Sequence, residues 1–154
     1  MDPLLLDLSV IVPVYNEEES LPHLVSELHA ALEPTGLSYE LVLVDDGSVD
    51  GSYALLERMA RLDPSLHVVR FRRNFGQTAA MQAGLDASRG RKVVTIDADL
   101  QNDPADIPAM LAKLDEGYDM VAGWRKNRQD AFVNRKLPSM IANRIISLAT
   151  RVKL

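Results

Sequence analysis

The chain has 154 residues, enough for about one domain, and 47% of them are hydrophobic, enough to bury a core. It contains no cysteine, which excludes disulfides, thiolate metal sites and cysteine nucleophiles. The net charge of −5 conceals an asymmetry, because residues 1–124 hold 9 Lys and Arg against 21 Asp and Glu, whereas residues 125–154 hold 8 against a single Asp130. The basic final segment predicts an anionic partner near the C-terminus, and nucleic acid is not among the partners that we expect.

Neither a membrane-spanning segment nor an export signal is predicted from these residues. No apolar run approaches the roughly 20 residues that a transmembrane helix needs. The first residues lack the basic start and the long apolar stretch of a signal peptide. We therefore expect a reduced, cytoplasmic setting for these residues, with no signal peptide and no transmembrane helix.

Strands and helices are predicted to alternate along the chain. The predicted strands cover residues 8–14, 39–44, 67–71, 93–96 and 120–122. Helices are predicted after Ser20, after Ser52, over residues 79–87 and after Pro104, and Gly117 should end the last of them. This alternation predicts an α/β fold, a mostly parallel sheet with helices on both faces.

Apolar stripes define the buried faces of three of these helices. The first stripe comprises Leu21, Leu24, Val25, Leu28 and Leu32, the second Leu55, Met59 and Leu62, and the fourth helix should bury Ile107, Met110, Leu111 and Leu114.

The stretch 93–104 carries the strongest chemical signal. Val93 to Ile96 reads as a buried strand that runs directly into two carboxylates, Asp97 and Asp99. Together with the amide of Gln101 they form an all-oxygen donor set, which suits Mg²⁺ or Mn²⁺ better than zinc. The alternative is a helix-capping cluster without a metal, since Asp103 and Pro104 are typical of a helix start.

Other polar residues follow the predicted strands at the same edge of the sheet. They are Tyr15 and Glu17, Asp45 and Asp46, Arg73, and Arg125. Ligands of open α/β sheets bind beyond the carboxyl ends of the strands, so this convergence favours the metal interpretation. No Gly-x-Gly-x-x-Gly and no Gly-Lys-Ser/Thr occurs, so metal and Arg side chains would have to balance a diphosphate.

Four runs in this order resemble a known family. They are Val-Ile-Val-Pro-Val-Tyr-Asn-Glu-Glu, Val-Asp-Asp-Gly-Ser-Val-Asp-Gly, Arg-Asn-Phe-Gly-Gln and Asp-Ala-Asp-Leu-Gln-Asn-Asp-Pro. They are similar to those of the family 2 glycosyltransferases of the GT-A (Rossmann-like) fold, and most similar to the branch that glycosylates polyprenyl phosphates. Catalytic domains of that branch continue past the position of Leu154, so we expect this chain to be part of a longer protein.

The resemblance implies roles for individual residues. Pro13, Tyr15 and Glu17 should line a nucleoside pocket. Asp45 should bind the base or ribose, and the neighbouring Asp46 should also belong to the nucleotide-binding site. Asp97, Asp99 and Gln101 should hold the metal. Arg125 should face the donor diphosphate, and Arg135 and Ser139 should receive the lipid phosphate.

The implied reaction is an inverting transfer of a hexose from a nucleotide diphosphate sugar, with uridine favoured as the nucleoside, to a polyprenyl phosphate. The nucleophile would be an already ionised phosphate oxygen, so no general base is required. Two alternatives stay open: a soluble glycosyltransferase or nucleotidyltransferase with a small-molecule or saccharide acceptor, and a nucleotide-sugar-binding fragment without turnover. A homo-oligomer is also left open.

The chain is predicted to divide into a catalytic domain, residues 1–137, and a basic amphipathic helix, residues 138–154. The apolar stripe of this helix comprises Ile141, Ile145, Leu148 and Val152. A basic amphipathic helix can lie in the plane of an anionic membrane surface. We therefore expect peripheral association with the cytoplasmic face of a membrane; the alternative is an ordinary helix packed on the rest of the protein.

Overall fold

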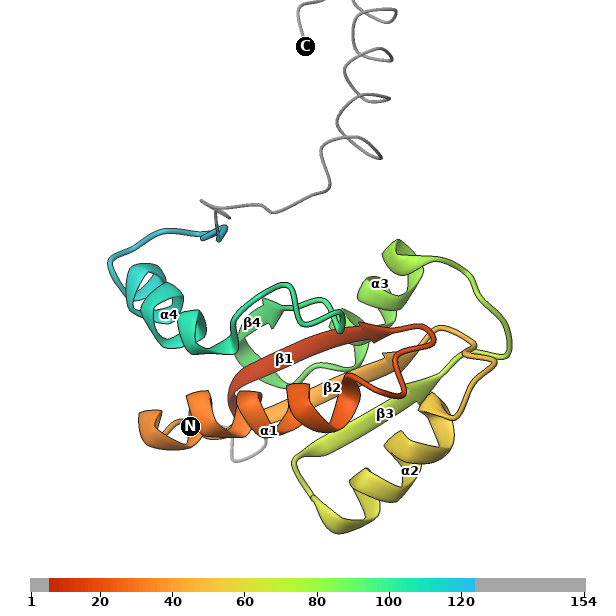
Figure 1. The fold of residues 1–154 in the computed structure, drawn as a ribbon. Helices are drawn as coiled ribbons and strands as arrows, with labels where there is room; N and C mark the ends of the chain where they lie inside the picture. Colours follow the sequence, from red (N-terminus) through yellow and green to blue (C-terminus); the bar gives the residue numbers. More distant parts are fainter. Residues whose placement is uncertain (1–5, 124–154) are drawn as a thin grey trace, which may run out of the picture. The chain divides into compact units, whose positions relative to one another are not determined.

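The structure is a computed structural model, and it describes residues 6–123 (Figure 1). Four strands form one sheet: β1 (Leu6–Val14), β2 (Tyr39–Asp45), β3 (Leu66–Arg70) and β4 (Gly90–Thr95). All the pairings are parallel and the strand order is β3-β2-β1-β4. The register places Val14 beside Asp45 and Asp45 beside Arg70, so the loops that follow these strands leave the sheet at one edge.

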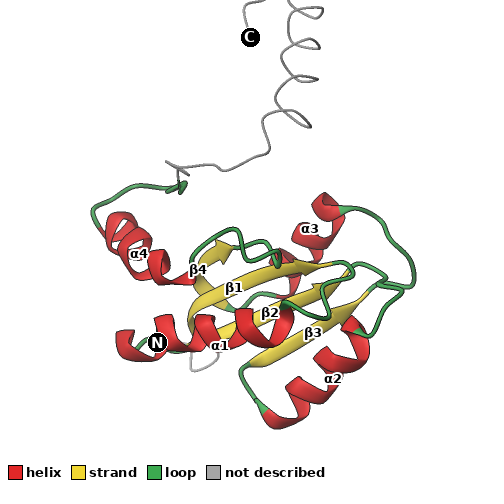
Figure 2. Ribbon diagram, in the orientation of Figure 1, coloured by secondary structure: helices red, strands yellow, loops and turns green. Residues whose placement is uncertain are grey.

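The helices cover both faces of this sheet (Figure 2). They are α1 (Leu21–Leu32), α2 (Ser52–Leu62), α3 (Gln77–Ala87) and α4 (Ile107–Asp115), with short 3₁₀ turns η1 (Glu33–Thr35) and η2 (Pro104–Asp106). Residues of α1, α2 and α4 pack with alternate β1 and β2 residues in the larger core. Ala80 of α3 packs with Ile11 and Val42 on the opposite face. The predicted α/β class, with a parallel sheet between two helical layers, is confirmed.

Three features of the helices agree with predictions made from neighbouring residues alone. All five apolar residues of the first stripe are buried in α1, as the one-sided 3.6-residue period requires. The carboxylate of Asp103 accepts a hydrogen bond from the Ala105 N–H at 2.9 Å, so it caps the turn before α4 as predicted. Gly117 follows α4 with φ of 102°, a left-handed conformation that glycine adopts without strain.

Three expectations about the elements are wrong. Residues 120–122 form no strand. Leu62 is 84% exposed because it is the last residue of α2, where the chain turns toward β3, and Leu56 is the leucine that this helix buries. Residues Val93 to Thr95 are at most half-buried, since β4 pairs only with β1 and lies at the edge of the described sheet.

None of the helices described between residues 6 and 123 combines the length and apolar character that crossing a bilayer demands. The predicted segment 138–154 and the proposed site residues Arg125, Arg135 and Ser139 lie outside the described residues.

Candidate functional site

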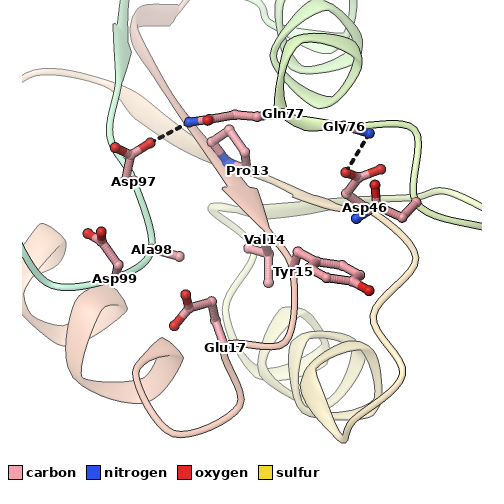
Figure 3. A pocket seen from close by; sticks show the side chains of 11 residues that line it. Pro13, Val14, Tyr15, Glu17, Asp46, Gly76, Gln77, Asp97, Ala98 and Asp99 are labelled. Carbon is pink, nitrogen blue, oxygen red and sulfur yellow. Dashed lines mark hydrogen bonds between the residues drawn. The ribbon is translucent and has the colours of Figure 1, made fainter. Parts of the chain in front are cut away.

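A cavity of about 330 Å³ opens where the carboxyl ends of β1, β2 and β4 meet (Figure 3). Most of the site residues predicted within the described range line it: Pro13, Tyr15, Glu17, Asp46, Asp97 and Asp99. Three of the predicted residues therefore come from β1 and its loop, one from the loop after β2 and two from the loop after β4. The structure thus brings together side chains that are up to 86 positions apart in the sequence.

The loop after β1 forms one wall, and the loop after β2 holds it in place. Asn16 has a left-handed backbone, with φ of 55°. Its side-chain oxygen accepts a hydrogen bond from the Val49 N–H at 2.9 Å, and its own N–H donates to Ser48 Oγ at 3.0 Å. The Glu17 N–H donates to Ser52 Oγ at 2.9 Å. These bonds fix the backbone on which Tyr15 and Glu17 stand.

The Glu17 carboxylate has its own local partner. Ser20 was predicted to cap α1 and does stand at that position, but its side chain accepts no hydrogen bond from the helix. Its hydroxyl instead donates to Glu17 Oε2 at 2.7 Å. Figure 3 shows the carboxylate of Glu17 on the same side of the cavity as that of Asp99.

Besides lining the cavity, Asp46 binds the backbone of the loop before α3. Its Oδ1 accepts a hydrogen bond from the Phe75 N–H at 2.7 Å, and its Oδ2 accepts one from the Gly76 N–H at 2.9 Å. The side chain is only 3% exposed. Both carboxylate oxygens thus bind the loop before α3, and this contact bears more on the shape of the wall than on direct ligand binding.

Asp45 does not line the cavity and lies buried, with no exposed surface. Its Oδ1 accepts a hydrogen bond from the Ser48 N–H at 3.3 Å. Its Oδ2 is the only buried side-chain oxygen or nitrogen without a hydrogen-bond partner within residues 6–123. A buried oxygen left in this state costs free energy that a hydrogen-bond donor from a ligand could recover.

The two carboxylates that follow β4 differ in their surroundings. Asp97 is half-buried, and its Oδ1 accepts a hydrogen bond from Gln77 Nε2 at 2.7 Å. Asp99 is exposed, and its Oδ1 accepts one from the Gln101 N–H at 3.1 Å. The structure does not place the predicted third ligand, Gln101, among the residues that line the cavity.

The donor set fits a hard cation that shares its coordination with a ligand. Within the described part of the chain no three His, Cys, Asp or Glu side chains group closely enough to enclose a metal ion. Mg²⁺ is commonly held by one or two carboxylates, with substrate phosphates and water completing the shell. Asp97 and Asp99 supply two such carboxylates on one cavity.

Five lining residues were not predicted: Val14, Asn74, Gly76, Gln77 and Ala98. Asn74, Gly76 and Gln77 belong to the run Arg-Asn-Phe-Gly-Gln, which was noted as part of the family pattern, but these three residues were given no role. The available signal was its position, because a loop that follows a parallel strand must emerge at the same edge as Tyr15 and Asp97.

Comparisons with known proteins identify the family of the chain. The profile of the family described as Glycosyl transferase family 2 matches residues 9–153. A dodecaprenyl-phosphate galacturonate synthase from Rhizobium johnstonii is 48% identical over 151 residues, which cover 97% of this chain and 45% of that protein. An undecaprenyl-phosphate 4-deoxy-4-formamido-L-arabinose transferase from Enterobacter sp. is 49% identical over 144 residues, covering 92% and 43%. The chain therefore spans about half the length of these curated relatives.

Two solved structures of similar fold contain nucleotide sugars. The mannosyltransferase PcManGT from Pyrobaculum calidifontis, in complex with GDP-Man and Mn²⁺, aligns with a TM-score of 0.59 and 28% identity over 70% of this chain and 31% of that one. Residues 1–349 of S. aureus TarS, in complex with UDP-GlcNAc, align with a TM-score of 0.62 and 26% identity over 83% and 38%.

Proposed function

Because the chain belongs to glycosyltransferase family 2, we propose that its cavity binds a nucleotide diphosphate sugar with Mg²⁺ or Mn²⁺, and that the sugar passes to a polyprenyl phosphate. The observation that carries this proposal is the placement of Asp97 and Asp99 on the same cavity as Pro13 and Tyr15. Relatives named as transferases acting on polyprenyl phosphates support the acceptor, and the neighbours bound to GDP-Man and UDP-GlcNAc support the donor class.

We propose a separate role in ligand binding for each group of residues around the cavity. Pro13 and Tyr15 offer an apolar and aromatic surface to the nucleoside. We also propose that Asp45 accepts a hydrogen bond from the base or ribose through Oδ2, the oxygen that lacks a partner in the described residues. Because Asp45 has no exposed surface, this contact requires the loop after β2 to move when the nucleoside binds. Asp97 and Asp99 would hold the cation beside the diphosphate. When bound, the cation supplies positive charge that stabilises the departing nucleoside diphosphate.

The transfer itself needs positioning more than proton removal. An oxygen of the acceptor phosphate attacks the anomeric carbon, the bond from that carbon to the diphosphate breaks, and the nucleoside diphosphate leaves with the electron pair. The attack comes from the opposite face, so the configuration inverts. The family resemblance assigns Arg125 to the donor diphosphate, and Arg135 and Ser139 to the acceptor phosphate. Guanidinium groups suit the two Arg roles because they bind phosphate oxygens in pairs. This acceptor would be met at the cytoplasmic surface of a membrane.

A thermal-shift screen tests the donor half of the proposal. UDP, GDP and their sugar conjugates would be added with and without Mn²⁺, since a ligand that binds only the folded state raises its unfolding temperature. We expect a shift that requires both nucleotide and metal. Asp99→Ala should abolish it with the fold intact, whereas Asp86→Ala, a matched exposed carboxylate on α3, should leave it unchanged. A rise in unfolding temperature that does not depend on the metal, or that persists in Asp99→Ala, contradicts the assignment of Asp99 as a metal ligand.

Turnover tests the acceptor half separately. The expected product, with a short-chain polyprenyl phosphate as acceptor, is the glycosylated lipid phosphate. Metal-dependent nucleotide binding without that product, in this chain and in a longer form that continues past Leu154, would favour the nucleotide-sugar-binding alternative. Transfer to a soluble saccharide instead would favour the soluble glycosyltransferase.

A further inference from the structure

We infer that Gln77 is a positioning residue for the metal site: its side-chain amide holds the carboxylate of Asp97 in the orientation that a divalent cation requires. This inference rests on the proposed function and adds to it a residue with no previously assigned role. The bond that carries it joins Gln77 Nε2 to Asp97 Oδ1 at 2.7 Å. Figure 3 shows the Gln77 side chain extending across the cavity toward Asp97.

The chemistry of the pair fixes the direction of this bond. An ionised carboxylate only accepts hydrogen bonds, so the amide nitrogen must face Asp97. Oδ1 is then engaged by Gln77, and the carboxylate retains further lone pairs for a cation. Side chains that hydrogen-bond to metal ligands orient them, and their loss typically lowers metal affinity about 10- to 100-fold.

Gln77 can hold Asp97 because its own backbone is fixed. It is the first residue of α3, and the N–H groups of the two preceding residues, Phe75 and Gly76, both donate to Asp46. Gly76 has φ of 95°, which lets the chain turn sharply into the helix. The buried carboxylate of Asp46 thus anchors the loop, the loop sets the helix start, and the helix start aims the amide of Gln77 across the cavity.

If Gln77 had a purely structural role, its loss would change stability but not metal binding. Another glutamine of α3 serves as a control for this alternative. Gln82 lies on the same helix and donates from Nε2 to Asp86 Oδ1 at 2.8 Å. Both glutamines are exposed, and both make one amide-to-carboxylate bond. Only the bond of Gln77 ends on a residue that lines the cavity. Loss of either bond removes one amide-to-carboxylate hydrogen bond, within α3 for Gln82 and between α3 and the loop after β4 for Gln77, but only the loss at Gln77 should affect metal binding.

The experiment compares Gln77→Met with Gln82→Met. Methionine keeps the length and helix propensity of glutamine but cannot donate a hydrogen bond. Free Mn²⁺ would be measured by electron paramagnetic resonance during titration, at a fixed concentration of UDP or GDP, whichever stabilises the unchanged protein. We expect the dissociation constant for Mn²⁺ to rise about 10-fold or more in Gln77→Met and to stay unchanged in Gln82→Met, with similar unfolding temperatures.

The outcomes separate this inference from the proposed function. If the unchanged protein binds Mn²⁺ and Gln77→Met binds it equally well, the positioning role is overturned while the metal site stands. If the unchanged protein itself binds no Mn²⁺, both are overturned. Should Gln77→Met fail to fold, Gln77→Asn serves instead, because its amide is one methylene too short for the 2.7 Å bond and the same loss of affinity is expected.

Discussion

Gly47 and Arg73 meet backbone to backbone: a Cβ on Gly47 would lie 2.3 Å from the carbonyl carbon of Arg73. Gly47 also has φ of 70°, a left-handed conformation. It directly follows Asp46, whose carboxylate accepts hydrogen bonds from the same loop, at Phe75 and Gly76. Two loops that form one wall of the cavity are therefore in direct contact, with no room for a side chain between them.

The first prediction follows from this contact. Gly47→Ala should lower the free energy of unfolding by about 3 kcal/mol or more, because it adds a severe backbone clash to an unfavourable conformation. Gly36→Ala is the matched control: Gly36 has φ of 69°, but nothing lies within 4 Å of its added Cβ. It should cost only about 1 kcal/mol. Equal losses in urea denaturation would show that the close approach contributes nothing.

The second prediction concerns a buried carboxylate at the opposite ends of the strands. Glu40 is 1% exposed and accepts hydrogen bonds from Arg89 N at 2.6 Å, Arg89 Nε at 2.9 Å and Ser9 Oγ at 2.6 Å. Burial by itself raises the pKa of Glu40, but the hydrogen bonds from Ser9 and Arg89 outweigh it and hold the pKa below its ordinary value. Glu40→Gln should therefore lower the free energy of unfolding by about 2 kcal/mol at pH 7.

The pH dependence of Glu40→Gln has a definite sign. A carboxylate with a depressed pKa stabilises the fold above its unfolded-state pKa, and this contribution is lost as the pH falls through its folded-state pKa. The difference in stability between the parent and Glu40→Gln should thus shrink as the pH is lowered from 7 toward 3. Glu57→Gln, which disrupts an exposed pair with Arg61 on α2, should change stability by less than about 0.5 kcal/mol at any pH. A difference for Glu40→Gln that stays constant with pH contradicts the prediction.

The third prediction tests the oxygen of Asp45 that has no partner. Asp45→Asn keeps the size and the acceptor for the Ser48 N–H, but it can replace Oδ2 by a donor. Nucleotide binding should weaken by about 1–3 kcal/mol, the value of a lost charge-assisted hydrogen bond, and should remain metal-dependent. Isothermal titration with the best nucleotide of the thermal-shift screen measures this loss. Equal affinity in variant and parent would assign Asp45 a purely structural role.

The fourth prediction concerns the basic segment outside the described residues. Residues 125–154 carry 8 Lys and Arg and one acidic residue. Each basic residue near an anionic surface contributes about 1 kcal/mol, and salt screens the attraction. The chain should float with liposomes that contain phosphatidylglycerol, and less so as salt increases. Removal of residues 138–154 should abolish flotation and leave nucleotide binding intact; undiminished flotation of the shortened chain would refute the interface helix.

Much of the fold could be predicted because its signals are local. The stripe of α1, the cap at Asp103 and the stop at Gly117 each depend on residues within a few positions of one another. The edge position of β4 could not be predicted in the same way, since strand order depends on which distant strands pair. Its half-burial follows from that order alone.

The residues of the site also differ in whether local sequence or a distant contact determines their role. Tyr15, Glu17, Asp97 and Asp99 immediately follow strands, so parallel topology alone predicts that they converge. Gln77 was missed because its partner is 20 residues away and a glutamine at a helix start is unremarkable in sequence. Asp46 was assigned to the ligand, and only the structure shows that both of its oxygens bind the loop of Gly76.

The charge of the cavity has a consequence for how the two proposed ligands bind. Its lining within the described residues includes four carboxylates, from Glu17, Asp46, Asp97 and Asp99, and neither Lys nor Arg. A bare diphosphate would be repelled from such a surface, and a bare cation would find only part of its coordination shell. In the proposed site each ligand should therefore raise the affinity for the other, and thermodynamic linkage requires the two enhancements to be equal. The proposed site should therefore bind the metal and the nucleotide diphosphate cooperatively, and each of them only weakly without the other.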